Sequence, residues 1–291
     1  MQKSFAKLVI VTAAVIMAMS VNFAQQVLMI DETGTRVFVV QNEHYATFLT
    51  LATFEGISYK ECLGLTSLCP NECGHSGNMA SFNIDQYLAF GKFNEFGDGK
   101  DGRFLVLLDN GDGTTPLVDQ IVYNTMRALN RDEKVLLSWN HIYTIKQSGE
   151  FTMQFPDRPI NFILPLTDAQ AKLIPTVPVP TAPDGFEGVL NRYYVSLTKF
   201  GGMVEGHGTF NIERHLFTYY YNDLATREFL STYVINPKTT HKDIVREMNK
   251  LKKDNFALIA FRRDIIDRNI ISTPLFVIPL SNAEAVNLLN N

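Results

Sequence analysis

The sequence carries no signature of a familiar catalytic site. It has no G-x-S-x-G turn of a serine hydrolase, no H-E-x-x-H motif of a zinc protease and no phosphate-binding P-loop. It also lacks an excess of basic residues, because 26 Lys and Arg stand against 30 Asp and Glu. A nucleic-acid-binding protein normally presents a basic surface. These absences predict no catalytic residues and argue against a nucleic-acid binder.

Cysteine is scarce, and all three copies fall in one stretch, residues 62–75, which we term the cysteine segment. Cys62, Cys69 and Cys73 are followed by His75 in the spacing C-x6-C-x3-C-x-H. Three thiolates and one imidazole are the ligands of a closed Cys3His zinc site, in which no position is open to a substrate. The segment therefore predicts bound zinc in a structural role. Copper(I) is a minor alternative, since thiolates also suit soft ions.

Oxidation is a second interpretation of the same cysteines. Three cysteines cannot all pair within one chain. A disulfide between Cys62 and Cys69, or between Cys62 and Cys73, would leave one free thiol. Outside the cytoplasm thiols tend to oxidise, so this interpretation stands beside the metal.

Residues 1–24 have the features of an export signal. Lys3 and Lys7 precede an apolar run, residues 8–19, which has the length of a signal-peptide core and is shorter than the ~20 residues of a spanning helix. Ala24 is a small residue at the expected cleavage position. We therefore expect an exported protein of bacterial type, periplasmic or secreted, with no membrane span after cleavage. An uncleaved N-terminal anchor is the alternative.

Cleavage would also change the charge of the chain. It would remove two of the 26 basic residues and no acidic residue, which leaves 24 basic and 30 acidic residues. For an acidic exported protein, a sugar or another protein is a better expected partner than nucleic acid.

The two halves of the chain contain similar motifs in the same order. They are Gly-His (74–75 and 206–207), Phe-Asn-Ile (82–84 and 210–212) and Phe-x-x-Pro-Leu (162–166 and 276–280). A proline-rich segment, 174–185, separates the halves and is expected to be an extended spacer. We predict a tandem duplication with a first domain at 25–173, which includes an N-terminal hairpin, and a second at 186–291.

Each half is expected to contain the same series of elements. In the first half these are strands at 47–57, 80–90 and 103–108, a helix at 117–130, strands at 134–145 and 159–166, and a short helix from Asp168. In the second half they are strands at 193–200, 209–221 and 228–235, a helix at 239–253, and strands at 255–264 and 274–280. The order resembles the OB-fold, a five-stranded barrel. The predicted fold class is therefore mainly β with short helices, in two tandem OB-like barrels of no named family.

Two further sets of residues are candidates for binding. His141 follows the only tryptophan and has no counterpart in the second half, so we consider it a further metal ligand beside the cysteine segment, or else an exposed strand histidine. Simple alternation along the strand at 209–221 predicts an outward stripe made of His215, Phe217, Tyr219 and Tyr221. OB-folds stack bases or sugar rings on that strand, whereas packing between the two domains would bury the stripe.

Together these features predict an exported, non-enzymatic binding or interaction module. Its cysteine segment would be a structural metal knuckle, and its ligand is not apparent from the sequence. The alternative is a metal-dependent or thiol-redox enzyme centred on that segment. Two Asp/Gly-rich stretches, 98–102 and 109–113, lack the full pattern of a calcium loop and are expected to be turns.

Overall fold

The computed structural model describes residues 27–30, 37–61, 76–93, 95–148, 151–175, 192–219, 231–266 and 269–290. The predicted export signal, the cysteine segment and most of the proline-rich segment lie outside these residues. The chain divides into two compact units, one made of Met1–His44 with Ile142–Asp157 and the other of Tyr45–His141 with Arg158–Asn291. The second unit thus takes residues from both halves of the sequence.

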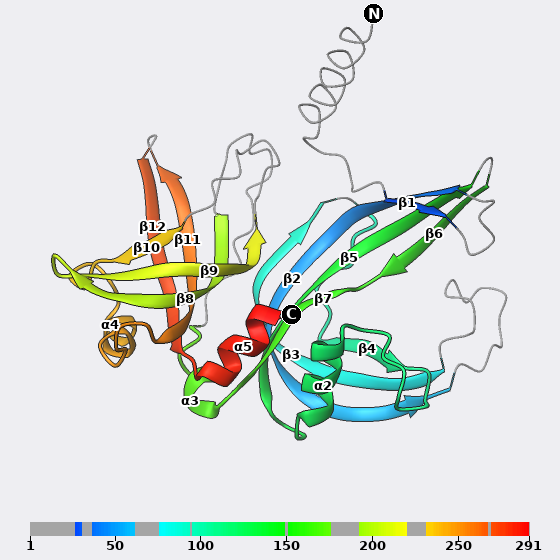
Figure 1. Ribbon diagram of the computed structural model, residues 1–291, viewed down its shortest axis with the longest axis horizontal. Coiled ribbons are helices and arrows are strands. Elements are labelled where there is room, and N and C mark those ends of the chain that lie inside the picture. Colours follow the sequence, from blue (N-terminus) through cyan, green and yellow to red (C-terminus); the bar gives the residue numbers. More distant parts are fainter. Residues whose placement is uncertain are drawn as a thin grey trace, which may run out of the picture. The chain divides into compact units, whose positions relative to one another are not determined.

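The fold is mainly β, as the sequence predicts, and its strands form two antiparallel sheets (Figure 1). The strands of the first sheet are β1 (Val27–Ile30), β2 (Val37–Lys60), β3 (Gly77–Lys92), β4 (Arg103–Asp109), β5 (Lys134–Ser148), β6 (Phe151–Asp157) and β7 (Ile160–Leu166). Its order is β4-β3-β2-β5-β6, while β1 pairs with β2 and β7 with β5. β6 was not expected from the sequence.

The second sheet consists of β8 (Arg192–Val204), β9 (His207–Tyr219), β10 (Thr232–Ile235), β11 (Phe256–Ile266) and β12 (Asn269–Pro279), in the order β10-β9-β8-β11-β12. The helices are α2 (Gln120–Ala128), α3 (Asp168–Ala171), α4 (Lys242–Met248) and α5 (Asn282–Asn290). Three of them lie where a helix is expected. α5 was not expected.

The two sheets share their strand order once β1 and β6 are set aside. β4-β3-β2-β5-β7 in the first corresponds to β10-β9-β8-β11-β12 in the second. The irregularities also correspond, because β2 and β8 each shift register three times against the next strand at matching positions. The last shift comes at Gly56 in β2 and at Gly202 in β8, with φ of 125° and 104°. These are backbone conformations that favour glycine.

Three apolar clusters hold the second unit together. One includes β2, β4 and α2, where Trp139 stacks on Phe104 with ring centroids 4.0 Å apart. Another includes β9, β10 and α4, where Phe261 stacks on Tyr233 at 4.1 Å. The third, which we term the shared core, draws buried residues from both sheets. Within the second unit, each sheet therefore carries an apolar cluster on both faces, in contrast to a sheet that is solvated on one side.

The first sheet is not closed into a barrel by strand pairing in the described residues. β4 and β7 are its edge strands in the second unit, and neither pairs with the other. α2 packs across both, because Val122 and Met126 lie in one cluster with Phe104 of β4 and Ile163 of β7. Asp119 begins the helix by accepting hydrogen bonds from the amides of the first turn.

Candidate functional site

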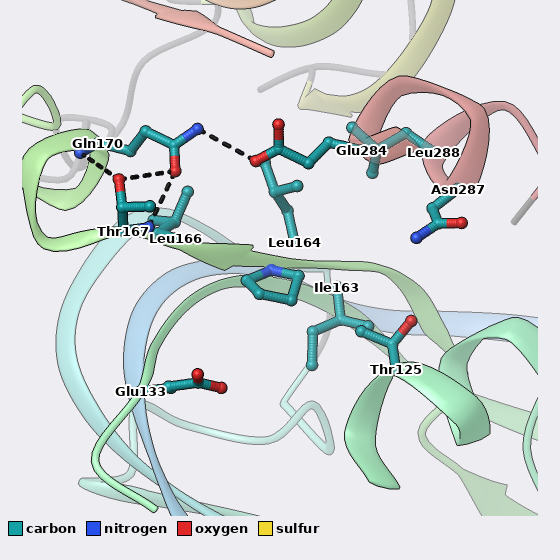
Figure 2. Close-up of a pocket in the computed structure, with 11 residues that line it drawn as sticks. Thr125, Glu133, Ile163, Leu164, Leu166, Thr167, Gln170, Glu284, Asn287 and Leu288 are labelled. Atoms are coloured by element: carbon teal, nitrogen blue, oxygen red, sulfur yellow. Dashed lines mark hydrogen bonds between the residues drawn. The ribbon is translucent and has the colours of Figure 1, made fainter. Parts of the chain in front are cut away.

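A groove lies along β7, between α2 and α5 (Figure 2). It consists of one hollow of about 310 Å³ and an adjoining one of about 440 Å³, which share part of their lining. The first is lined by Thr125, Glu133, Ile163, Leu164, Pro165, Leu166, Thr167, Gln170, Glu284, Asn287 and Leu288. Apolar walls with a few polar groups are typical of a binding site.

Two capping boxes position the polar residues at one end of the groove. In α3, Thr167 Oγ1 accepts from the amide of Gln170 (3.2 Å), while Gln170 Oε1 accepts from the amide of Thr167 (2.9 Å). In α5, Ser281 and Glu284 form the same pair of bonds, at 3.3 and 2.6 Å. The side chains then meet, because Gln170 Nε2 donates to Glu284 Oε1 over 3.2 Å (Figure 2).

The groove is lined by carboxylates and by no cation. Glu133 accepts from the amide and the side chain of Asn130 at 2.8 and 3.0 Å, which leaves part of its acceptor capacity free. Neither Glu133 nor Glu284 forms an ion pair with any residue that the structure describes. The lining of the two hollows contains no Lys, Arg or His. The charged side chains in the lining of the two hollows are therefore all acidic.

The cysteine segment itself lies outside the described residues, so Cys62, Cys69, Cys73 and His75 have no observed positions. Its two ends are described. The chain enters the segment from Lys60 at the end of β2 and leaves it at Gly77 at the start of β3, and these two residues are paired in the sheet. In the described parts of the chain, no three His, Cys, Asp or Glu residues are grouped as metal ligands would be.

The buried carboxylate of Asp109 links β3, β4 and α2 by hydrogen bonds at this end of the sheet. Asp109, at the end of β4, is fully buried and accepts from Asn78 of β3 (2.6 Å), Tyr123 (3.1 Å) and Arg127 (2.7 Å) of α2, and the amide of Gly111 (2.8 Å). Burial alone would raise the pKa of Asp109. The hydrogen bonds outweigh it, so the pKa lies below its usual value.

The backbone around Asp109 leaves little room for larger residues. A side chain at Gly77 would collide with the carbonyl oxygen of Asp109. Tyr59 of β2 covers Gly111 in the turn that follows β4. The sequence predicts this turn but not the role of Asp109, because Asn78 and Arg127 are distant in sequence and mark no motif.

His141 belongs to a different cluster. It is only 3% exposed, in contrast to the exposed histidine of the alternative interpretation. Its Nδ1 accepts from the amide of Asp98 (3.0 Å), whose carboxylate pairs with Arg158 (2.7 Å). The ring also lies edge-on to Tyr45. The cysteine segment has no described position, so a role of His141 as a further metal ligand stays a prediction.

The expected outward stripe on β9 does not follow a single face. Phe217 is 4% exposed and belongs to the shared core, as the packing alternative expects. His215 is half-buried and is hydrogen-bonded to Ser196 Oγ at 2.8 Å. The side chains of Tyr219 and Tyr221 lie outside the described residues. Simple alternation failed because the β8–β9 pairing shifts register between Val195 and Ser196.

Comparisons with protein-family models, with curated proteins and with solved structures found no match. None of the helices in the described parts of the chain is long and apolar enough to cross a bilayer. The functional argument therefore rests on the geometry of this chain.

Proposed function

We propose that the protein is an exported, non-enzymatic binding module made of two copies of an OB-like unit, with the cysteine segment as a structural metal knuckle. The observation that carries the metal site is the Lys60–Gly77 pair, which joins the two ends of that segment. Cys62 comes two residues after Lys60, and His75 two residues before Gly77. The segment therefore starts and ends at paired positions of the sheet.

The base of the segment favours metal binding for a further reason. Ordering a loop costs conformational entropy, and this cost is lower when the ends are already fixed. The β2–β3 pairing and the hydrogen bonds from Asn78 to Asp109 fix both ends before any ion binds. Asp109 and the residues hydrogen-bonded to it therefore support the base of the segment.

Duplication is supported by details that the two halves share beyond strand order. Trp139 with Phe104 matches Phe261 with Tyr233, and each pair is stacked at nearly the same distance. Asp132 and Asp254 occupy the matching turn before β5 and β11, with positive φ of 69° and 68°. Independent origin of so many matching irregularities is improbable, so we infer copies of one unit.

The OB-like character is supported by connectivity. β2, β3, β4, α2, β5 and β7 follow each other as the strands and the helix of that barrel do, and the second half repeats the series. The departure is the unpaired β4–β7 edge, where α2 takes the place of strand closure. We propose a sugar or a protein as the partner, since the chain has more acidic than basic residues.

Metal content tests the proposal. Protein purified from the exported fraction without chelator is expected to contain one zinc ion per chain by elemental analysis, and Cys62→Ser should abolish it. His207→Ala, in the Gly-His motif of the second half, is the matched control and should retain the metal. A metal-free protein with one disulfide by mass spectrometry would overturn the knuckle. A bound ion with a solvent-occupied position in X-ray absorption spectra would instead support the enzyme alternative.

A further inference from the structure

We propose that α4 and its flanking turns dock on the surface of a bilayer that contains anionic lipids, with the adjacent tip of the β8–β9 hairpin against the headgroups. This role is independent of what the cysteine segment binds. It rests on three observations: a local excess of lysine, the orientation of α4 and an exposed apolar tip.

The basic residues of the chain are concentrated around α4. Residues 238–253 contain six of the 26 basic residues and two of the 30 acidic residues, which leaves 20 basic and 28 acidic residues elsewhere. All six basic residues are exposed, and we term them the basic surface: Lys238, Lys242, Arg246, Lys250, Lys252 and Lys253. A chain with an excess of acidic residues thus carries a positive patch on one helix and its flanks.

The first half has no such patch at the matching helix. When Asp132 is aligned with Asp254, Met126 of α2 matches Met248 of α4, and both methionines are fully buried. The residues that match the basic surface are then Pro116, Gln120, Asn124, Ala128, Asn130 and Arg131. Only one of them is basic, although the same helix forms. The lysines are therefore not needed to build the helix, which leaves a role at the surface.

The basic surface faces away from the core. The helical repeat places the buried residues of α4 on the side opposite to Lys242 and Arg246. Glu247 neutralises part of the charge, because it pairs with Arg246 (3.1 Å) and Lys250 (2.7 Å). The four remaining lysines form no ion pair with any residue that the structure describes. Their charge is available to a partner.

Lysine suits an extended charged surface better than a single bound anion. Five of the six basic residues are lysines, whose ammonium is a point charge, whereas bidentate recognition of one phosphate or carboxylate uses arginine. The basic surface also contributes no residue to the two hollows of the groove. A cluster of about four to eight basic residues on a helix is typical of binding to anionic lipids.

An apolar tip next to α4 favours a bilayer over a soluble polyanion. Met203 and Val204, at the end of β8, are 50% and 53% exposed. Met203 pairs with Gly208 of β9, where a side chain would collide with Met248, so the hairpin passes beside the end of α4 (Figure 1). Glu205 follows them, so the attraction comes from the basic surface and not from the tip. Apolar side chains beside a basic patch suit the boundary between headgroups and acyl chains.

Flotation with lipid vesicles tests the proposal on protein purified from the exported fraction. We expect binding at low salt to vesicles made of equal parts of phosphatidylglycerol and phosphatidylcholine, and none to phosphatidylcholine alone. Lys252→Gln combined with Lys253→Gln should weaken binding at least ~tenfold, because each lysine near an anionic surface adds to the attraction. Lys92→Gln combined with Lys172→Gln removes the same charge from exposed sites in the first half and should leave binding unchanged.

The remaining outcomes are equally decisive. Equal binding to both kinds of vesicle, or an equal loss in the two double variants, would show that the basic surface is not the site. Met203→Ser should weaken binding to vesicles and leave binding to soluble polyphosphate unchanged. If this variant binds vesicles as the wild type does, and polyphosphate binds as tightly, the surface recognises soluble polyanions and docking on a bilayer is wrong. These readouts do not depend on metal content, so they separate this inference from the proposed knuckle.

Discussion

Gln170 and Glu284 occupy the same position in the two halves of the chain and are hydrogen-bonded to each other, with 3.2 Å between Gln170 Nε2 and Glu284 Oε1. Contact between matching residues is the pattern of an interface in a symmetric dimer. The shared core follows the same pattern, because Leu136 and Phe162 meet their counterparts Leu258 and Phe276 there. In this pair, however, one amide and one carboxylate replace the identical side chains of a true dimer.

Replacing the amide of this pair tests the contact. Gln170→Glu would place two carboxylates side by side and remove the hydrogen bond to Pro279. Like charges raise the folded-state pKa, so the repulsion is present at neutral pH and disappears as pH falls through that pKa. We expect a loss of about 1–2 kcal/mol in unfolding free energy at pH 7.5 and a smaller loss at pH 4. Urea denaturation at both values measures it, and a pH-independent loss would contradict repulsion.

Removing the buried carboxylate should be more damaging. Asp109→Ala would leave Asn78 and Arg127 without their acceptor in a buried site, at a cost of about 3–5 kcal/mol. Asp112→Asn is the matched control, because Asp112 is exposed in the same turn, and it should shift the urea midpoint much less. Comparable midpoints for the two variants would show that the hydrogen bonds to Asp109 contribute little.

The stability supplied by Asp109 should also depend on pH. Its pKa is lower in the folded protein than in the unfolded chain, so its contribution is complete above the unfolded pKa of about 4. It is lost as pH falls through the folded value. The difference in unfolding free energy between the wild type and Asp109→Asn should therefore shrink below pH 4. A difference that grows on acidification would reverse the assigned sign.

A single methyl group added at Gly77 should strain the backbone at the base of the cysteine segment. Gly77→Ala would press a Cβ against the Asp109 carbonyl, so a backbone shift costing about 1–3 kcal/mol is expected. Gly99→Ala places its Cβ in open space and serves as the control, with an effect within about 1 kcal/mol. If the base positions the metal ligands, zinc affinity should fall only in the first variant. Competition with a chromogenic chelator measures that affinity.

The single tryptophan offers a test of the matching cores. Trp139 is 3% exposed and stacks on Phe48 and Phe104, whereas the second half has Phe261 at the matching position. Trp139→Phe should therefore cost only about 1–2 kcal/mol, and Trp139→Ala about 3–5 kcal/mol. Denaturation followed by circular dichroism measures both. Equal losses would mean that the first core does not accept the ring that the second uses.

Strand positions could be predicted from the sequence because they rest on local patterns. The strands around Phe82 and Phe210 were expected from short apolar runs, and both are present. The start of β2 pairs with β1 in the N-terminal hairpin that the sequence predicts, but the continuous strand Val37–Lys60 is longer than the one expected at 47–57. α5 was missed although Ser281 and Glu284 form a capping box, a signal that the sequence does contain.

The candidate groove was harder to predict than the strands. Its polar residues come from α2, α3, α5 and the turn before β5, and only folding brings Glu133 and Glu284 to one cavity. Phe217 shows the limit of alternation, because an extra residue in β9, Leu216, shifts the pairing with β8 and turned a residue expected outside into part of the core. Patterns in a single sequence reveal the periodicity of apolar residues and the caps of helices. They do not reveal register shifts between strands or contacts between the two halves of the chain.

Because the shared core contains residues of both halves, the covalent connection between the halves affects how this core forms. Phe162 and Phe276 both belong to the shared core, to which each half contributes a buried apolar face. The same faces could be satisfied by the complementary half of a neighbouring molecule, which is the route to swapped dimers. Residues 176–191 connect the halves covalently, which keeps the correct partner at an effective concentration on the order of millimolar. Below that protein concentration, closure within one chain is favoured over exchange between chains.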